Sequence, residues 1–171
     1  MDHLDELFSK DLDTAIERAK EAGRFDIADY LSLRASNDSI REEAVKWLFD
    51  TVLDVVFAFN RHGARIKIEQ TAKHRIKYGA SQLSGEKLEL RQGLRCLTIE
   101  AGWTRSTGDG VMRGGSLAFS RISHFGFRKE TEELELIRFE NVPQWFLIED
   151  EKRRVSFNVS SLKKHFEVFL G

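Results

Sequence analysis

The chain has 171 residues, of which 41% are hydrophobic and 32% charged, and its formal net charge is −1. This balance is typical of a folded globular protein and excludes a disordered one. The longest unbroken apolar run, Val55 to Phe59, is far shorter than a membrane span of about 20 residues, and the single cysteine, Cys96, excludes an internal disulfide. The acidic N-terminus lacks the basic and then apolar pattern of a signal peptide. We therefore expect a soluble cytoplasmic protein with no membrane partner.

The charged side chains are unevenly distributed along the sequence. Residues 1–60 hold 7 Lys and Arg against 14 Asp and Glu, residues 61–128 hold 13 against 5, and residues 129–171 hold 7 against 9. The nearly neutral total therefore conceals a strongly basic middle. Such asymmetry indicates either an anionic partner or an internal docking surface.

Residues 1–60 predict about three helices from their apolar spacing and end signals. A first helix is expected from a cap at Asp11 to a stop at Gly23, and a second short one over residues 25–33 would form a hairpin with it. The polar run 36–39 is expected to break the pattern. A third helix is expected from a capping box at Ser39 to about Asn60. Its segment 52–59 is apolar almost all round, so we expect it to be covered on more than one side.

From residue 64 the apolar period changes from 3.6 to 2, which predicts short strands. They are separated by turn signals that include Gly79, Ser84-Gly85, Gly93 and Asn141. Ser160 or Ser161 is expected to cap a last amphipathic helix. The strands are expected at residues 65–69, 75–78, 87–90, 94–100, 116–123, 134–140, 145–149 and 155–159.

Together these elements predict an α+β fold in a single domain. An N-terminal helical subdomain of about three helices (1–60) would pack on an antiparallel sheet or half-barrel of roughly six to eight strands (64–159). A short C-terminal helix (160–170) would follow.

Four cations near the first predicted strands are candidate anion ligands: Arg65, Lys67, Arg75 and Lys77. Regular alternation would place all four on one face of the sheet. The basic middle is also rich in arginine, whose planar fork suits bidentate contacts with phosphate or carboxylate. The alternative is a solvated face whose cations pair with the acidic helices.

The glycine-rich segment 103–116 is the second candidate site. Arg105 and Arg113 would hold an anion there, with Trp103 and Asp109 as further lining groups. The segment is not a phosphate-binding P-loop, because a predicted strand follows it where a helix would be required. The alternative is a long mobile hairpin, for which Asp109-Gly110 is a common turn signal.

Catalytic and metal-binding signals are weak. Cys96 with His124 or His62 as base has the composition of a thiol nucleophile, but Cys96 lies on an apolar strand face, where a small buried side chain is expected. Glu100 and Asp109 are a candidate carboxylate pair whose separation the sequence does not fix. The scattered histidines lack the spacing of a zinc site, so no metal and no cofactor are expected.

These observations favour a non-enzymatic binding or interaction module whose basic sheet face docks an anionic ligand, nucleic acid being one candidate. No recognition helix, zinc finger or aromatic RNA-binding signature is present. One alternative is a homo-oligomeric or partner-docking protein that uses the apolar helix 52–59. Another is a small-molecule enzyme with its site at the loop 103–116, in which His124, Asp109 or Cys96 would react.

Overall fold

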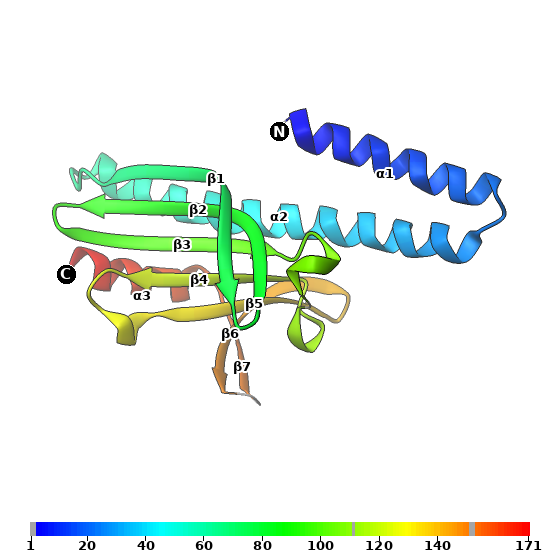
Figure 1. The fold of residues 1–171 in the computed structure, drawn as a ribbon. Helices are drawn as coiled ribbons and strands as arrows, with labels where there is room; N and C mark the ends of the chain where they lie inside the picture. The colour runs from blue at the N-terminus through cyan, green and yellow to red at the C-terminus, as the bar shows by residue number, and fades with distance from the viewer. Residues whose placement is uncertain (1–2, 111, 151–152) are drawn as a thin grey trace. The chain divides into compact units, whose positions relative to one another are not determined.

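The computed structural model describes the backbone of residues 3–110, 112–150 and 153–171, and their side chains except at 3–9, 107 and 113 (Figure 1). In this part of the chain there are three α-helices and a seven-stranded antiparallel sheet, which confirms the α+β prediction. None of the described helices is long and apolar enough to cross a bilayer. The chain divides into two compact units, Met1–Glu42 and Glu43–Gly171.

The first unit is a helical hairpin made by α1 (His3–Glu21) and the start of α2 (Phe25–Arg61). Gly23, with a φ of 73°, ends the first helix as predicted. The Arg24 N–H donates to the carbonyl of Ala19, which closes the turn. The side chains of Ile16, Ala19 and Ala28 are buried inside this hairpin.

The predicted break at residues 36–39 is absent, because α2 continues through it from Phe25 to Arg61. The N-terminal region therefore has two helices and not three. Polar residues without Gly or Pro cost a helix only a few tenths of a kcal/mol each. An ion pair of 2.7 Å between Arg41 Nη1 and Asp38 Oδ1, one helical turn apart, helps to carry the helix across the polar segment.

The sheet is a meander in which each strand pairs with the next one along the chain, in the order β1 to β7. Gly79, Gly93 and Asn141 have positive φ in the tight turns where the sequence predicted turns. The strands are β1 (Lys67–Tyr78), β2 (Ser81–Gln92), β3 (Arg95–Trp103), β4 (Ala118–His124), β5 (Glu132–Phe139), β6 (Val142–Asp150) and β7 (Arg153–Ser156).

Two irregularities bend the hairpin of β1 and β2, whose sharp curve is visible in Figure 1. A register shift between Thr71 and His74 puts one extra residue on β1. Gly85, predicted to lie in a turn, instead lies inside β2 opposite Gly102 of β3. A Cβ at Gly85 would collide with the carbonyl oxygen of Ala101, so only glycine permits this approach.

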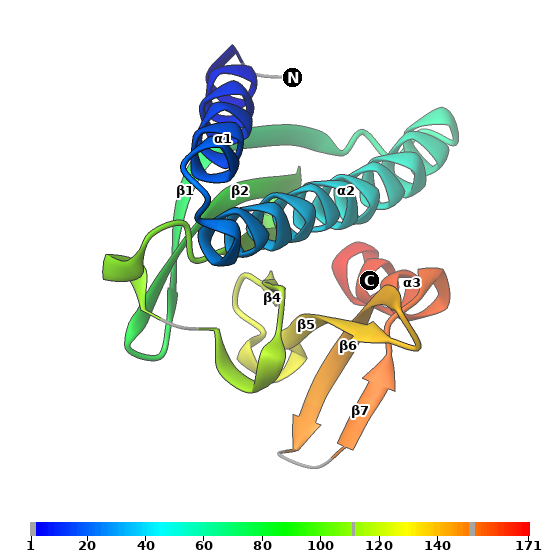
Figure 2. The same cartoon turned by 90° about the vertical axis from the view of Figure 1, so that its right-hand side faces the viewer.

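The main core of the second unit lies between one sheet face and two helical segments, residues 43–61 of α2 and α3 (Val159–Leu170), which lie along the same face in Figures 1 and 2. The strands contribute an apolar side chain at every second residue, and the helices contribute one at every third or fourth residue. The helical members are Val45, Leu48, Phe49, Val52, Val56, Leu162, Phe166 and Phe169, and the strand members include Leu88, Leu90, Leu97, Ile99, Ile122, Leu134 and Leu136.

Only part of the apolar segment 52–59 is covered. Val52 and Val56 are fully buried, whereas Phe57 is 50% exposed. The ring of Phe59 stacks on Phe166 of α3 with 5.7 Å between centroids. The segment therefore contributes to the chain's own core on one side.

The N-cap of helix α3 lies two residues before Ser160, the first of the two predicted caps. Asn158 is its N-cap, and the Asn158 side chain accepts a hydrogen bond from the Ser161 N–H. Leu162, Phe166 and Phe169 lie on the buried face of this amphipathic helix. His165, which the sequence did not single out, is buried beside them.

Candidate functional site

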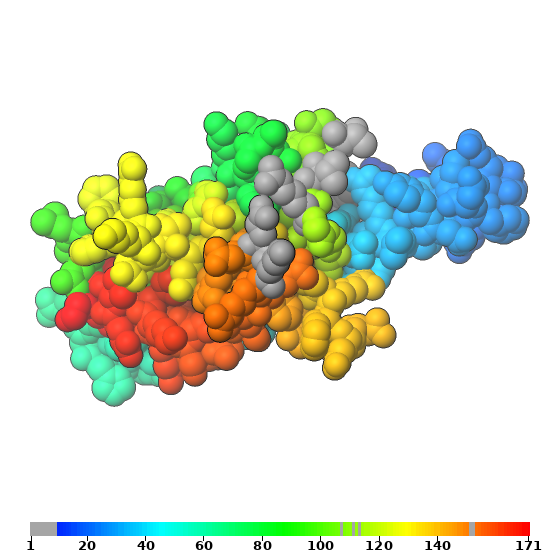
Figure 3. All heavy atoms as spheres, turned by 90° about the horizontal axis from the view of Figure 1, so that it is seen from below, coloured from blue at the N-terminus to red at the C-terminus, as the bar shows by residue number. Residues whose placement is uncertain are grey.

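One end of the sheet in the second unit combines three connections that carry many cations: the α2–β1 loop, the β2–β3 turn and the β4–β5 loop (left end of Figure 1). We call residues 61–67, 91–95 and 124–131 the basic end. These ranges contain seven Lys and Arg against one acidic residue, Glu130. Figure 3 shows the yellow β4–β5 loop and the green β2–β3 turn at the same end of the surface.

Side-chain and backbone hydrogen bonds fix the three connections to one another. The Asn60 side chain binds both backbone groups of Ile66, accepting from its N–H at 2.7 Å and donating to its carbonyl at 3.0 Å. Gln92 Nε2 donates to the carbonyl of Ala64 at 2.6 Å, which ties the first loop to β2. The Phe125 N–H donates to the carbonyl of Cys96 at 2.9 Å, which ties the third loop to β3. The basic end is therefore held in a defined shape.

Five cations of the basic end are exposed and make no ion pair with any residue that the structure describes. These are Arg61, Arg65, Lys67, Arg128 and Lys129. Cations elsewhere on the sheet commonly have acidic partners, as Lys87 has Glu89 at 3.1 Å and Arg121 has Glu133 at 3.1 Å. The charge of the basic end is thus available to a ligand.

Large apolar side chains are exposed among these cations. Leu94 is 97% exposed in the two-residue β2–β3 turn, and Phe125 and Phe127 are 77% and 54% exposed in the β4–β5 loop. Gly126, with a φ of 82°, separates the two phenylalanines. Three such side chains at one end of a unit indicate an interaction surface, because scattered exposed residues would not cluster in this way.

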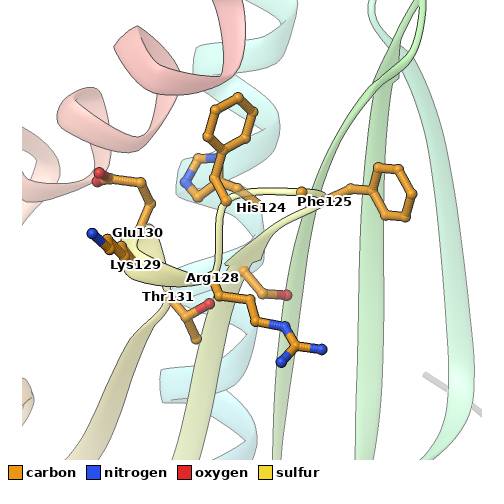
Figure 4. Close-up of a pocket in the computed structure, with 9 residues that line it drawn as sticks. His124, Phe125, Arg128, Lys129, Glu130 and Thr131 are labelled. Carbon is orange, nitrogen blue, oxygen red and sulfur yellow. The ribbon is translucent and has the colours of Figure 1, made fainter.

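An open hollow is lined by residues 123–131 of the β4–β5 loop (Figure 4). Phe125 and Arg128 extend to the same side of the loop, and Lys129 and Glu130 extend to the other. The hollow therefore presents an aromatic ring and a guanidinium group together.

Beneath this hollow, a chain of hydrogen bonds connects three elements. His124 Nε2 of β4 lies 2.9 Å from His165 Nδ1 of α3, and His165 Nε2 lies 2.7 Å from Glu132 Oε2 of β5. With His165 neutral and donating to the carboxylate, its Nδ1 accepts the proton of His124 Nε2. Burial, followed by the nearby His165, lowers the pKa of His124. The hydrogen bond from His165 lowers the pKa of Glu132.

This chain anchors the β4–β5 loop to the core. Both imidazoles are almost fully buried and their rings are stacked at 5.2 Å. Among the described residues, no group of three or more His, Cys, Asp and Glu side chains is placed to hold a metal ion. These hydrogen bonds between His124, His165 and Glu132 can position the loop that carries Phe125 and Arg128.

The four predicted strand cations do not share one face, so that prediction is wrong. The extra residue between Thr71 and His74 reverses the alternation, which places Arg75 and Lys77 on the face opposite Lys67. Arg75 Nη1 also pairs with Asp109 Oδ1 at 3.2 Å. Arg65 and Lys67 remain together at the basic end.

The loop 103–116 does not bring its predicted residues to a common site with His124. Trp103 is buried, and the Arg105 guanidinium lies over its ring at 3.9 Å. Asp109 accepts hydrogen bonds from the backbone N–H groups of Ser106 and Arg105, which lower its pKa. The side chain of Arg113 lies outside the described residues. His124 is at the far end of β4, where it pairs with Leu97.

The members of the two candidate pairs of reactive groups have other partners or face apart. Cys96 is a buried thiol whose Sγ lies 3.7 Å from Thr98 Oγ1. It projects from the face opposite His124, because His124 pairs with the adjacent residue of β3, Leu97. Glu100 Oε1 lies 2.5 Å from His74 Nε2, while Asp109 caps its own loop.

The sequence alone did not identify Leu94, Phe125, Phe127 and His165 as site residues. An apolar leucine directly after a turn glycine was the available signal for Leu94, because turn positions are normally polar. No protein-family model, curated protein sequence or solved structure matches this chain. What the chain does is therefore inferred from its own geometry.

Proposed function

We propose that residues 43–171 form a binding module that holds a phosphate-bearing polyanion, such as nucleic acid, at the basic end. The observation that supports this most directly is the set of exposed cations that make no ion pair with a described residue, drawn from two of the three connections there. A cation without a protein partner gains a charge-assisted hydrogen bond when phosphate binds, and it breaks no ion pair to do so.

The arrangement suits an extended anion better than a small one. Arg61, Arg65 and Lys67 belong to the α2–β1 connection, while Arg128 and Lys129 belong to the β4–β5 loop. Cations spread over separate loops match the repeated phosphates of a polymer, whose binding releases condensed counterions. Arg65 has a φ of 56°, and the two hydrogen bonds between Asn60 and Ile66 hold the loop in this left-handed conformation.

The test is fluorescence anisotropy with labelled DNA and RNA, single-stranded and duplex, at several salt concentrations. Wild-type protein should bind with an affinity that falls steeply with salt. The triple variant Arg65→Asn, Arg128→Gln and Lys129→Gln should bind duplex DNA much more weakly. Its log–log salt slope should be shallower by about 0.9 for each phosphate that the variant no longer neutralises. Asparagine is chosen at position 65 because it tolerates positive φ.

A matched control removes three cations elsewhere in the same unit: Lys46→Gln, Arg153→Gln and Arg154→Gln. It changes the net charge equally but leaves the basic end intact, so its binding and salt slope should stay close to wild type. Equally weakened binding in both triple variants would show that only net charge matters. No binding of any polyanion at low salt would refute the proposed function.

A further inference from the structure

The apolar side chains of the basic end have no electrostatic role in holding phosphate, so they indicate a second kind of contact. Phe125 and Phe127 are 77% and 54% exposed within a loop that also carries Arg128 and Lys129. A large apolar side chain that stays exposed lacks the favourable free energy of burial. A ligand that covers these rings would recover part of that free energy.

Hydrogen bonds hold the loop backbone that carries the rings. The Phe125 N–H is bonded to the carbonyl of Cys96, and the preceding His124 is anchored through His165 to Glu132. A ring on such a support loses little conformational entropy when it stacks on a flat partner.

We propose that the basic end binds single-stranded nucleic acid, with unpaired bases stacked on Phe125 and Phe127 and phosphates held by Arg65, Arg128 and Lys129. This inference rests on the proposed function and specifies which polyanion the basic end binds. A phenylalanine ring can stack on any base, because every base has a flat π-face. A duplex hides the faces of its bases inside the stack, so only an unpaired strand can offer them.

The charge of this surface and its hollow shape favour this ligand. Figure 4 places the ring of Phe125 and the guanidinium of Arg128 on the same side of the loop. A base on the ring would bring its own phosphate near the arginine. The lining of the hollow also includes Ser123 and Thr131, residues whose hydroxyl groups can hydrogen-bond to base edges.

The experiment compares single-stranded and duplex oligonucleotides of one sequence, for wild type and for the double variant Phe125→Ala and Phe127→Ala. Wild type should prefer the single strand. Each ring removed should weaken single-strand binding about tenfold or more, with duplex affinity and salt slope unchanged. The double variant Phe125→Tyr and Phe127→Tyr keeps both rings and should retain the preference. A single strand containing 2-aminopurine should change its fluorescence on stacking with wild type and the tyrosine variant, but not with the alanine variant.

The outcomes separate this inference from the proposed function. Equal binding of single strand and duplex, unaffected by removal of the rings, would overturn the inference and leave polyanion binding standing. Failure of every polyanion to bind would overturn both. Binding to vesicles of phosphatidylserine is measured as a further comparison. If they bind in preference to nucleic acid and Leu94→Ser abolishes that binding, the surface docks on anionic membrane and the inference is wrong.

Discussion

At the scale of single residues, the buried chain from His124 through His165 to Glu132 couples the candidate site to the core. Its members come from β4, α3 and β5, so the loop between β4 and β5 is fixed at both of its ends. The charged groups near it are Glu130, which acts on His124, and Lys164, which acts on Glu132. Each hydrogen bond between these three side chains has one donor and one acceptor when both imidazoles are neutral and the carboxylate is ionised.

Acid should therefore destabilise the protein in two stages. The folded-state pKa of His124 is lowered, so the unfolded chain takes up this proton first and stability falls as the pH drops through about 6.5. The folded-state pKa of Glu132 is also lowered, so its contribution is present above about pH 4.5 and is lost as the pH falls further. Urea unfolding from about pH 8 to about pH 3 measures both stages.

Two histidine variants separate the contribution of His124 from general acid effects. His124→Gln should flatten the loss of stability between about pH 7.5 and about pH 5.5. The control His62→Gln removes an exposed imidazole and should leave the wild-type pH dependence in place. A wild-type free energy of unfolding that is constant over this range would contradict the role given to His124.

At the scale of elements, the bend in β1 and β2 decides which residues meet. The bulge between Thr71 and His74 separates Lys67 from Arg75 and Lys77, and the close approach of Gly85 to Gly102 lets the hairpin curve. Beyond the bend, Ile76, Leu83 and Phe119 form a separate buried cluster. The cations at the start of β1 are left at the same end of the sheet as the β4–β5 loop.

Replacing Gly85 with alanine should destabilise the second unit by more than about 2 kcal/mol, because the new Cβ meets backbone atoms of Ala101 and Gly102 that cannot move aside cheaply. The matched control is Gly108→Ala, where the nearest heavy atom to a new Cβ is Ser106 Oγ at 3.8 Å. Thermal unfolding should show a drop of several degrees for Gly85→Ala and little change for Gly108→Ala. An unchanged melting temperature for Gly85→Ala would contradict this prediction, because it would mean that β2 and β3 move apart at no cost in free energy.

At the scale of the whole molecule, local patterns predicted the elements better than their meeting points. Alternation and turn glycines identified the antiparallel sheet, and Gly23 identified the first helical hairpin. The period did not reveal the extra residue near Thr71, because a bulge depends on pairing with β2. The sequence did not predict the basic end, for a related reason. Arg65 and Arg128 are 63 residues apart in sequence, and only the order of the strands brings their loops to one end.

The sorted charges lead to a prediction about the N-terminal region. None of the cations of the basic end lies in residues 1–42, and residues 1–24 carry seven Asp and Glu against four Lys and Arg. A variant that lacks residues 1–24 should therefore bind single-stranded nucleic acid at least as tightly as the full chain at low salt. The two affinities should converge near physiological ionic strength, where the screening length falls to about 8 Å. Titrations of both proteins over a range of salt measure this, and weaker binding by the truncated variant would place part of the site in the first unit.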